Sequence, residues 1–412
     1  MKNLGIKIAL YINYFVFAIL LNSVGIVIAK AINVYQVSES NASVLEAFKD
    51  LPIAIVSFIV ASFLPRFGYK KAMLTALAIV FVGCLAMIFG NTFMYTKLLF
   101  LTIGISFALI KLSVYSLIGV LTESKKEHAA FMSSIEGFFM IGIATAYFLF
   151  PAFYSETDPN AWLNVYYVVA GLIAISFLVL LFSKVAHVET TTVTTLKEDV
   201  KVSIGLITIP LVLVFLAAAF FFVMIEQGIM TWLPRFNEKI FQFSDVLSVQ
   251  MASILALSLA LGRFIAGYLS KKISWVYLVI GCVITSCVIL VTVLPKLSSN
   301  PSSIDTIQTL NGVPVIGFIL PLIGLFIAPI YPLLNSSVLS SLPQKLHSPM
   351  SGLIIVFSAL GGTLGSRIVG ELFESIGGAD AFYFLLIPML AVIIAVVLID
   401  KLSKKRQNTV TK

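Results

Sequence analysis

Long apolar runs recur from one end of this sequence to the other, and they constrain the fold more than any other feature. Apolar residue types make up 59% of the 412 residues, charged types only 11%, and the mean hydropathy is +1.06. A soluble domain of this size needs more polar surface than that, whereas a helix that crosses a bilayer takes ~20 apolar residues. The sequence therefore predicts an all-α membrane protein that crosses the bilayer many times.

Hydropathy predicts twelve spans, six on each side of a polar segment. We expect an N-terminal six-helix bundle over residues 1–185, a cytoplasmic linker over 186–203, a C-terminal six-helix bundle over 204–400 and a basic cytoplasmic tail over 401–412. The predicted spans are residues 6–32, 43–65, 72–91, 95–121, 129–152, 161–184, 204–234, 246–270, 274–294, 313–338, 350–374 and 380–400.

The distribution of positive charge predicts the orientation. Most Lys and Arg residues fall in the loops on one side, together with both ends of the chain, so the positive-inside rule predicts that both termini are cytoplasmic. The first apolar run is too long for a signal peptide and is interpreted as a retained span. The basic loops at 61–71 and 267–275 occupy the same place in each half, which indicates a weak internal repeat typical of transporters.

Several function classes are excluded by what the sequence lacks. The three cysteines lie in apolar runs and the three histidines in loops or at helix ends, so neither a disulfide framework nor a metal site is predicted. No phosphate-binding loop or catalytic set is present, and we expect no enzyme activity and no cofactor. The net charge of +8 is spread over short loops, which does not indicate nucleic-acid binding.

We expect a monomer in a lipid bilayer, in a bacterial inner membrane.

The loop between the second and third spans resembles the signature of the major facilitator superfamily, Gly-x-Leu-Ala-Asp-Arg-x-Gly-Arg-Arg. The chain matches it at Leu64 (one place displaced), Arg66, Gly68 and Lys70, and has Pro65 in place of the Asp. The resemblance implies twelve helices in two six-helix bundles and secondary active transport by alternating access. Fragments around Glu226, at 262–267 and at 358–365 are further similar to the fucose:proton symporter branch, in which the fourth-span position of Lys111 is a glutamate.

Ionisable residues inside the spans are the main candidates for function, because each costs ~2.5–3.5 kcal/mol on insertion scales and usually faces a pathway. Lys111 lies about 16 Å from the cytoplasmic end of its span. Its ammonium either binds an anionic solute or forms a fixed pair with Glu136 on the next span, and the two roles are compatible. Glu136 is also a candidate proton carrier.

Glu226 is the second proton-coupling candidate. It stands near the centre of the seventh span with no Lys or Arg within a helical turn, which favours a protonatable carboxyl over a bracing one. Gln227 and Arg235 extend a polar path outward from it, and Trp232 offers a ring face to a solute or serves as an interface anchor. Asn22 and Tyr115 are further solute-binding candidates through their amide and hydroxyl groups.

The remaining charges are interpreted as a gating or structural network. Arg367 and Glu371 are spaced i, i+4 and can neutralise each other. Internal pairing is also expected at the start of the second span. The network consists of Glu46, Lys49, Asp50, Arg66, Arg263, Arg367 and Glu371.

Together these features predict a secondary active transporter, with proton-coupled (or sodium-coupled) uptake of a small polar solute as the preferred mode. Lys111 favours a sugar acid or other organic anion over a neutral sugar. One alternative is a drug/proton antiporter, which the sequence Phe150-Pro151 in the fifth span argues against because antiporters often carry Gly-x-x-x-Gly-Pro there. The other is a transporter-like receptor or assembly protein, in which Lys111 and Glu226 would have no evident use.

Overall fold

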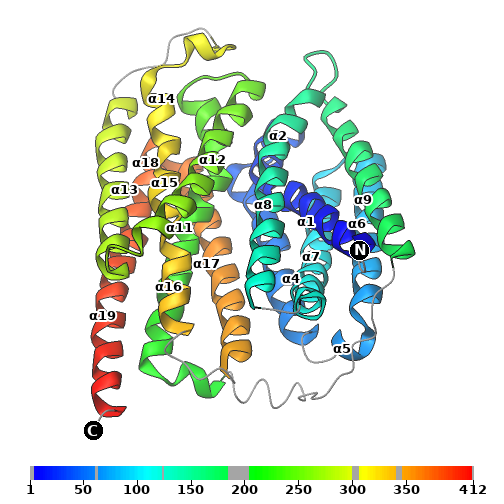
Figure 1. Ribbon diagram of the computed structural model, residues 1–412. Helices are drawn as coiled ribbons and strands as arrows, with labels where there is room; N and C mark the ends of the chain where they lie inside the picture. The colour runs from blue at the N-terminus through cyan, green and yellow to red at the C-terminus, as the bar shows by residue number, and fades with distance from the viewer. Residues whose placement is uncertain are drawn as a thin grey trace. The chain divides into compact units, whose positions relative to one another are not determined.

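The structure is a computed structural model that describes residues 4–60, 64–122, 125–183, 204–298, 306–339 and 346–410, and within these ranges it is almost entirely helical (Figure 1). Strand pairing among the described residues is limited to one isolated bridge, between Phe243 and Ile307. Helices satisfy their own backbone hydrogen bonds, as segments surrounded by lipid must.

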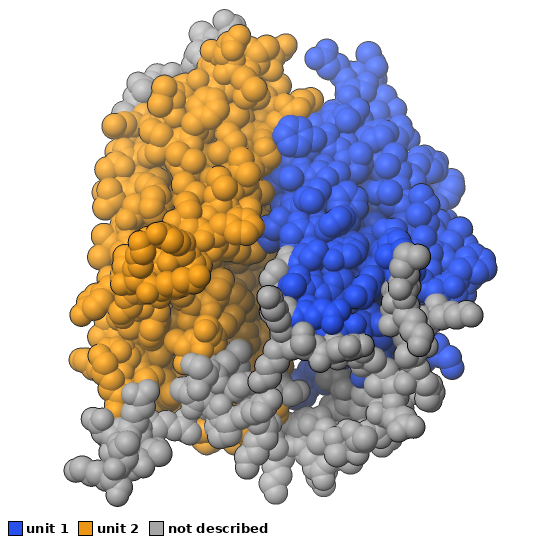
Figure 2. All heavy atoms as spheres, in the orientation of Figure 1, with its two compact units in different colours: residues 1–37, 44–196 blue, residues 38–43, 197–412 orange. Residues whose placement is uncertain are grey.

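The chain forms two compact units, coloured separately in Figure 2. Unit 1 comprises residues 1–37 and 44–196, and unit 2 comprises residues 38–43 and 197–412. The predicted linker, 186–203, lies outside the described residues. The six residues 38–43 stand in the chain between two helices of unit 1 yet make their contacts in unit 2, which no feature of the sequence indicates.

Unit 1 contains the helices of the first half of the chain. They are α1 (Leu4–Asn22), α2 (Val24–Tyr35), α4 (Val44–Val60), α5 (Leu64–Phe67), α6 (Tyr69–Gly90), α7 (Phe93–Leu121), α8 (Lys125–Leu149), η1 (Pro151–Phe153), η2 (Ala161–Asn164) and α9 (Val165–Phe182).

Unit 2 contains one short helix from the segment 38–43 and the helices of the second half. They are α3 (Glu39–Ala42), α11 (Pro210–Ile240), α12 (Asp245–Leu269), α13 (Trp275–Ser298), η3 (Leu310–Gly312), α14 (Val315–Ile319), η4 (Leu320–Leu322), α15 (Ile323–Ile327), α16 (Ile330–Leu339), α17 (His347–Ile376), α18 (Gly378–Ala381), η6 (Phe382–Leu385) and α19 (Leu386–Val410).

The predicted spans correspond to helices of the structure. Within the described residues, eleven helical runs are long and apolar enough to cross a membrane. The second predicted span, 43–65, corresponds to the 17-residue helix α4, which is followed by residues outside the described part. The expectation of an all-α membrane protein is confirmed.

Two spans are interrupted near their middle. The first is divided into α1 and α2 at Ser23, whose hydroxyl donates to the carbonyl of Leu20. The tenth is divided into α14, η4, α15 and α16 around Pro321 and Pro329, because a proline inside a helix removes a backbone hydrogen bond and crowds the preceding turn. Backbone groups freed at such breaks need other partners, so breaks mark places where a span bends.

Close helix packing in each unit depends on glycine. A Cβ at Gly104 of α7 would collide with the carbonyl oxygen of Lys49 on α4. In unit 2 a Cβ at Gly361 of α17 would collide with the carbonyl oxygen of Phe220 on α11. Small residues at these crossings let two backbones approach, which is how helices associate where no hydrophobic drive exists between them and lipid.

Candidate functional site

The central charged side chain of unit 1 lies among aromatic rings. Lys111 projects from α7 with its Nζ 5.8 Å from the ring centroid of Phe107 and 6.0 Å from that of Tyr115. Both distances fall at the limit of a cation–π contact. Among the described residues no carboxylate lies within ion-pair distance of Lys111. Its ammonium therefore has the two rings as its nearest partners, and the charge of Glu136 acts on it from farther away.

Glu136 has a different partner from the one expected for it. Its Oε1 accepts a hydrogen bond of 2.9 Å from the hydroxyl of Tyr115, which joins α8 to α7. The fixed Lys111–Glu136 pair considered from the sequence is therefore not formed, although Glu136 is the acid that acts electrostatically on Lys111. The ring of Tyr14, on α1, lies 6.2 Å from that of Tyr115. Three helices thus meet around one ammonium and one carboxylate.

The central acid of unit 2 has a cation beside it. Glu226 Oε1, on α11, lies 3.7 Å from Nη2 of Arg263 on α12. This corrects the interpretation of Glu226 as an acid without a neighbouring cation. The arginine comes from the next helix, so the sequence around Glu226 on α11 does not indicate it. The Glu226 side chain is 17% exposed and the Arg263 side chain 40%.

Tyr331 is a further polar residue near this pair and was not predicted from the sequence. It lies on α16, its ring stacks on Phe222 of α11 at 5.5 Å, and its hydroxyl is 3.1 Å from that of Ser358 on α17. The charge of Glu226 also acts electrostatically on the Tyr331 hydroxyl. The place of Tyr331 between Pro329 and Pro332 in the tenth span is the sequence feature that could have indicated it.

Trp232 does not offer a ring face. Its side chain is fully buried, its indole N–H donates to the carbonyl of Ser366 at 2.9 Å, and its ring stacks on Phe373 at 5.7 Å. Helix packing in unit 2 accounts for all of these contacts, which corrects the expectation of an accessible ring. Gln227 is half-buried on α11 beside Glu226, and the amide of Asn22 donates to the Ala18 carbonyl of its own helix at 2.9 Å.

The expected charge network is largely paired within single helices. Lys49 is buried and bonds to Glu46, and its Nζ lies 3.5 Å from Asp50. Arg367 pairs with Glu371 at 2.7 Å, as the i, i+4 spacing predicts. Arg367 and Glu371 neutralise each other along α17, whereas at the start of α4 one lysine lies against two carboxyl groups. The side chain of Arg66 lies outside the described residues.

Arg235 belongs to a buried ion cluster and not to an open polar path. Its Nη1 contacts Glu238 at 2.7 Å and its Nη2 contacts Glu39 of α3 at 2.9 Å. Arg367 donates to the carbonyl oxygen of Ser40, and the Ser40 N–H donates to Glu374 at 3.0 Å. These bonds hold the segment 38–43 against α11 and α17.

Metal binding finds no support in the described part of the chain, where no group of three or more His, Cys, Asp and Glu side chains is placed to hold an ion. The polar chemistry available is thus a lysine with aromatic neighbours, a tyrosine-bonded carboxylate, and a glutamate beside an arginine. Such a set can bind a polar solute and exchange a proton.

Comparisons with known protein families and solved structures agree with the membrane-spanning helical fold described above. The family model of the Major Facilitator Superfamily matches residues 10–366. A search of curated protein sequences gives no match. The structure is similar to that of a bacterial homologue of the human lysosomal transporter Spinster in an inward-facing, occupied conformation, with 14% identity, a TM-score of 0.71, and coverage of 98% of this chain and 96% of that one.

Two solved sugar symporters are similar as well. A D-xylose–proton symporter matches with 13% identity, a TM-score of 0.70 and coverage of 97% of each chain. A variant of the E. coli fucose:proton symporter matches with 13% identity, a TM-score of 0.65, and coverage of 97% of this chain and 99% of that one. At these identities the likeness is one of fold.

Proposed function

Because the chain belongs to the Major Facilitator Superfamily, we propose that it is a secondary active transporter that works by alternating access and takes up a small polar solute with protons. The protein is a multi-pass integral membrane protein, and the family and the structural neighbours it matches are transporters and not enzymes. The proposal extends to a monomer in a bacterial inner membrane. The sugar–proton symporters among the similar folds support proton coupling.

The observation that carries the choice of solute is the environment of Lys111. An ammonium in a span that has ring faces around it, and no carboxylate within ion-pair distance in the described residues, retains capacity for an anion. The solute is therefore an organic acid such as a sugar acid. Tyr115 and the neighbouring ring of Phe107 supply a hydrogen-bonding group and an apolar face for its carbon skeleton.

The proposed coupling site is the Glu226–Arg263 pair. A carboxylate 3.7 Å from an arginine is held by charge when ionised and releases the arginine when it is protonated. The released guanidinium then changes partners, which gives proton binding a structural consequence. Glu136, bonded to Tyr115, is the second acid in the proposal.

The test is uptake of labelled sugars and sugar acids into proteoliposomes that contain the purified protein, with and without an imposed pH gradient. We expect accumulation of an acidic solute that requires an inward proton gradient, and no accumulation of neutral sugars. A sodium gradient imposed at equal pH tests the other coupling ion. Solute accumulation that requires an outward proton gradient, as expected when solute is exchanged for protons, would contradict the proposal in favour of efflux. Binding of the solute without any transport would contradict it in favour of a receptor.

A further inference from the structure

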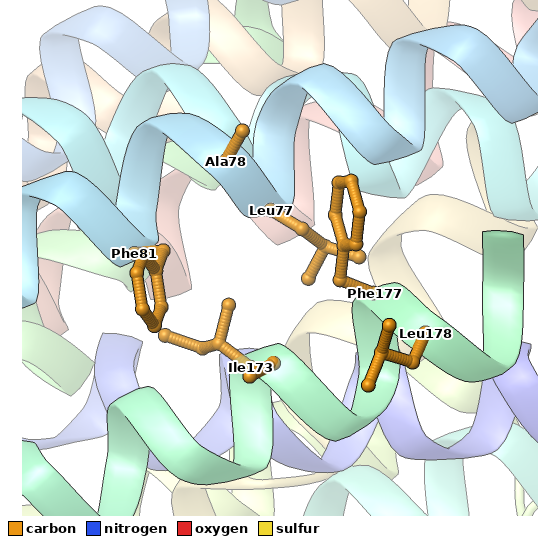
Figure 3. Close-up of a pocket in the computed structure, with 7 residues that line it drawn as sticks. Leu77, Ala78, Phe81, Ile173, Phe177 and Leu178 are labelled. Atoms are coloured by element: carbon orange, nitrogen blue, oxygen red, sulfur yellow. The ribbon is translucent and has the colours of Figure 1, made fainter.

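An apolar pocket of about 310 Å³ lies between two helices of unit 1, and none of the candidate site residues lines it (Figure 3). Ala78 of α6 and Ala174 of α9 are the small residues of its lining. Larger apolar side chains of the two helices, such as Phe81 and Ile173, lie around it. Its volume is at the lower end of that of ligand pockets, ~300–1,000 Å³. The surrounding residues are Leu77, Phe81, Ile173, Phe177 and Leu178.

The pocket opens on an exposed apolar face of unit 1, the kind of face that membrane-spanning helices present to lipid. Ala78 and Leu178 line it and are both exposed, and the neighbouring exposed side chains on the same two helices are large and apolar, such as Val82 and Ile175. Both helices are long and apolar enough to span a membrane. An all-apolar hollow on such a face suits a hydrocarbon chain and offers nothing to hold a polar solute in place.

A positive charge lies near the beginning of α6, on the same face of the helix as the pocket residue Ala78. Lys71 is exposed and lies seven residues, two helical turns, before Ala78, so the two share one face of the helix. Within the described part of the chain Lys71 makes no ion pair or hydrogen bond. Its neighbour Lys70 is already engaged, because its Nζ donates to the carbonyl oxygens of Leu181 and Ser183 at the end of α9.

The depth of the pocket matches a single leaflet. Leu77 and Phe81 lie about 9 Å and about 15 Å along the helix from Lys71 at 1.5 Å per residue, and half of a ~30 Å hydrocarbon core is ~15 Å. We propose that the pocket binds one acyl chain of an anionic glycerophospholipid, whose phosphate group lies against Lys71. The lipid comes from the leaflet that the positive-inside pattern predicts to be cytoplasmic.

The acyl-chain part is tested by native mass spectrometry of the detergent-purified protein with phosphatidylglycerol added. Ala174→Phe fills the pocket and should abolish the retained phosphatidylglycerol. Ile175→Phe places the same side chain on the adjacent, exposed position outside the lining and should leave retention unchanged. Ala78→Leu fills the space from α6, and it replaces Ala174→Phe as the test variant if Ala174→Phe melts at a lower temperature than the parent. Unchanged retention in folded Ala174→Phe or Ala78→Leu would overturn the proposal.

The headgroup part is tested with Lys71→Gln and its control Lys272→Gln, an exposed lysine of unit 2. Loss of one interfacial lysine, worth ~1 kcal/mol toward anionic lipid, should weaken phosphatidylglycerol retention about fivefold. Retention of phosphatidylcholine should be weaker in the parent and insensitive to the substitution. Equal retention of the two lipids would refute the charge contact. Retention of oleate as strongly as phosphatidylglycerol would identify a free fatty acid as the occupant and refute the phospholipid.

Discussion

Lys111 and its surroundings define the first expectation at the scale of single residues. Because its ammonium has ring faces and not a carboxylate beside it, removing the charge should affect the solute more than the fold. We expect Lys111→Gln to weaken binding of an acidic solute by ~1.5–3 kcal/mol, or ten- to a hundredfold. The half-saturation concentration for uptake measures this. If Lys111→Gln folds normally and binds every acidic solute as the parent does, a neutral solute is the remaining possibility.

Glu136 provides the control for that result. A buried fixed pair would make Lys111→Gln unstable and the double variant Lys111→Gln, Glu136→Gln more stable again. In the structure Tyr115 donates to Glu136, so the carboxylate keeps a partner when the lysine charge is lost. We therefore expect similar melting temperatures for the single and double variants in detergent. A clear recovery of stability in the double variant would restore the fixed-pair interpretation.

Glu226 carries the second residue-scale prediction. Glu226→Gln cannot exchange a proton, so it should lose accumulation driven by a pH gradient and keep counterflow exchange, which needs no net proton movement. Glu136→Gln is the matched variant and should lose less, because Glu136 is bonded to a tyrosine and has no arginine to release. Undiminished accumulation by Glu226→Gln would exclude it as the coupling residue.

At the scale of elements, the crossing of α11 and α17 is set by backbone contact. The methyl group of Gly361→Ala would approach the carbonyl oxygen of Phe220 more closely than real Cβ atoms do, and backbone cannot move aside as a flexible side chain can. We expect a loss of about 1–3 kcal/mol, seen as a lower melting temperature. Gly281→Ala on α13 is the control, because its Cβ would meet nothing within 4 Å. Equal effects of the two substitutions would rule out the backbone contact as the cause.

The α3 segment gives a pH-dependent prediction. Burial raises the pKa of Glu39, but the hydrogen bond and charge of Arg235, together with a backbone hydrogen bond and the charge of Lys239, outweigh it, so the pKa lies below its usual value of 4.5. A carboxyl with a lowered folded-state pKa contributes stability that is present above its unfolded pKa and lost as the pH falls through the folded value. The stability difference between the parent and Glu39→Gln should therefore be constant near neutral pH and shrink as the pH falls below about 4.5.

Melting temperatures of both proteins across that pH range measure this difference. Glu156→Gln removes an exposed carboxylate from a loop of unit 1 and serves as the control, for which no comparable convergence with the parent is expected. A gap between the parent and Glu39→Gln that stays constant to the lowest accessible pH would contradict the role assigned to Arg235.

At the scale of the whole molecule, the distribution of Lys and Arg predicts both ends of the chain on the cytoplasmic side. An even number of spans requires this common side. A C-terminal fusion to green fluorescent protein should therefore fluoresce in bacterial cells, and a C-terminal fusion to alkaline phosphatase should be inactive. The reverse result would invert the orientation and place the Lys71 end of α6 in the other leaflet.

The sequence by itself determined the class of molecule and the approximate positions of its spans. A span depends on local composition, because a helix in lipid satisfies its own backbone and needs only ~20 apolar residues. Proline breaks in the tenth span and the i, i+4 pair of Arg367 and Glu371 are also local, and the structure has both. The family signature in the 61–71 loop is local in the same way.

Only the tertiary structure decided which side chains meet across helices. The rotation of α12 against α11 brings Arg263 to Glu226, and that of α8 against α7 gives Glu136 to Tyr115 and not to Lys111. Trp232 became a packing residue because α17 covers it. These outcomes depend on helix rotation and crossing distance, which are set by packing of small residues over the whole helix and have no period in one sequence that could reveal them.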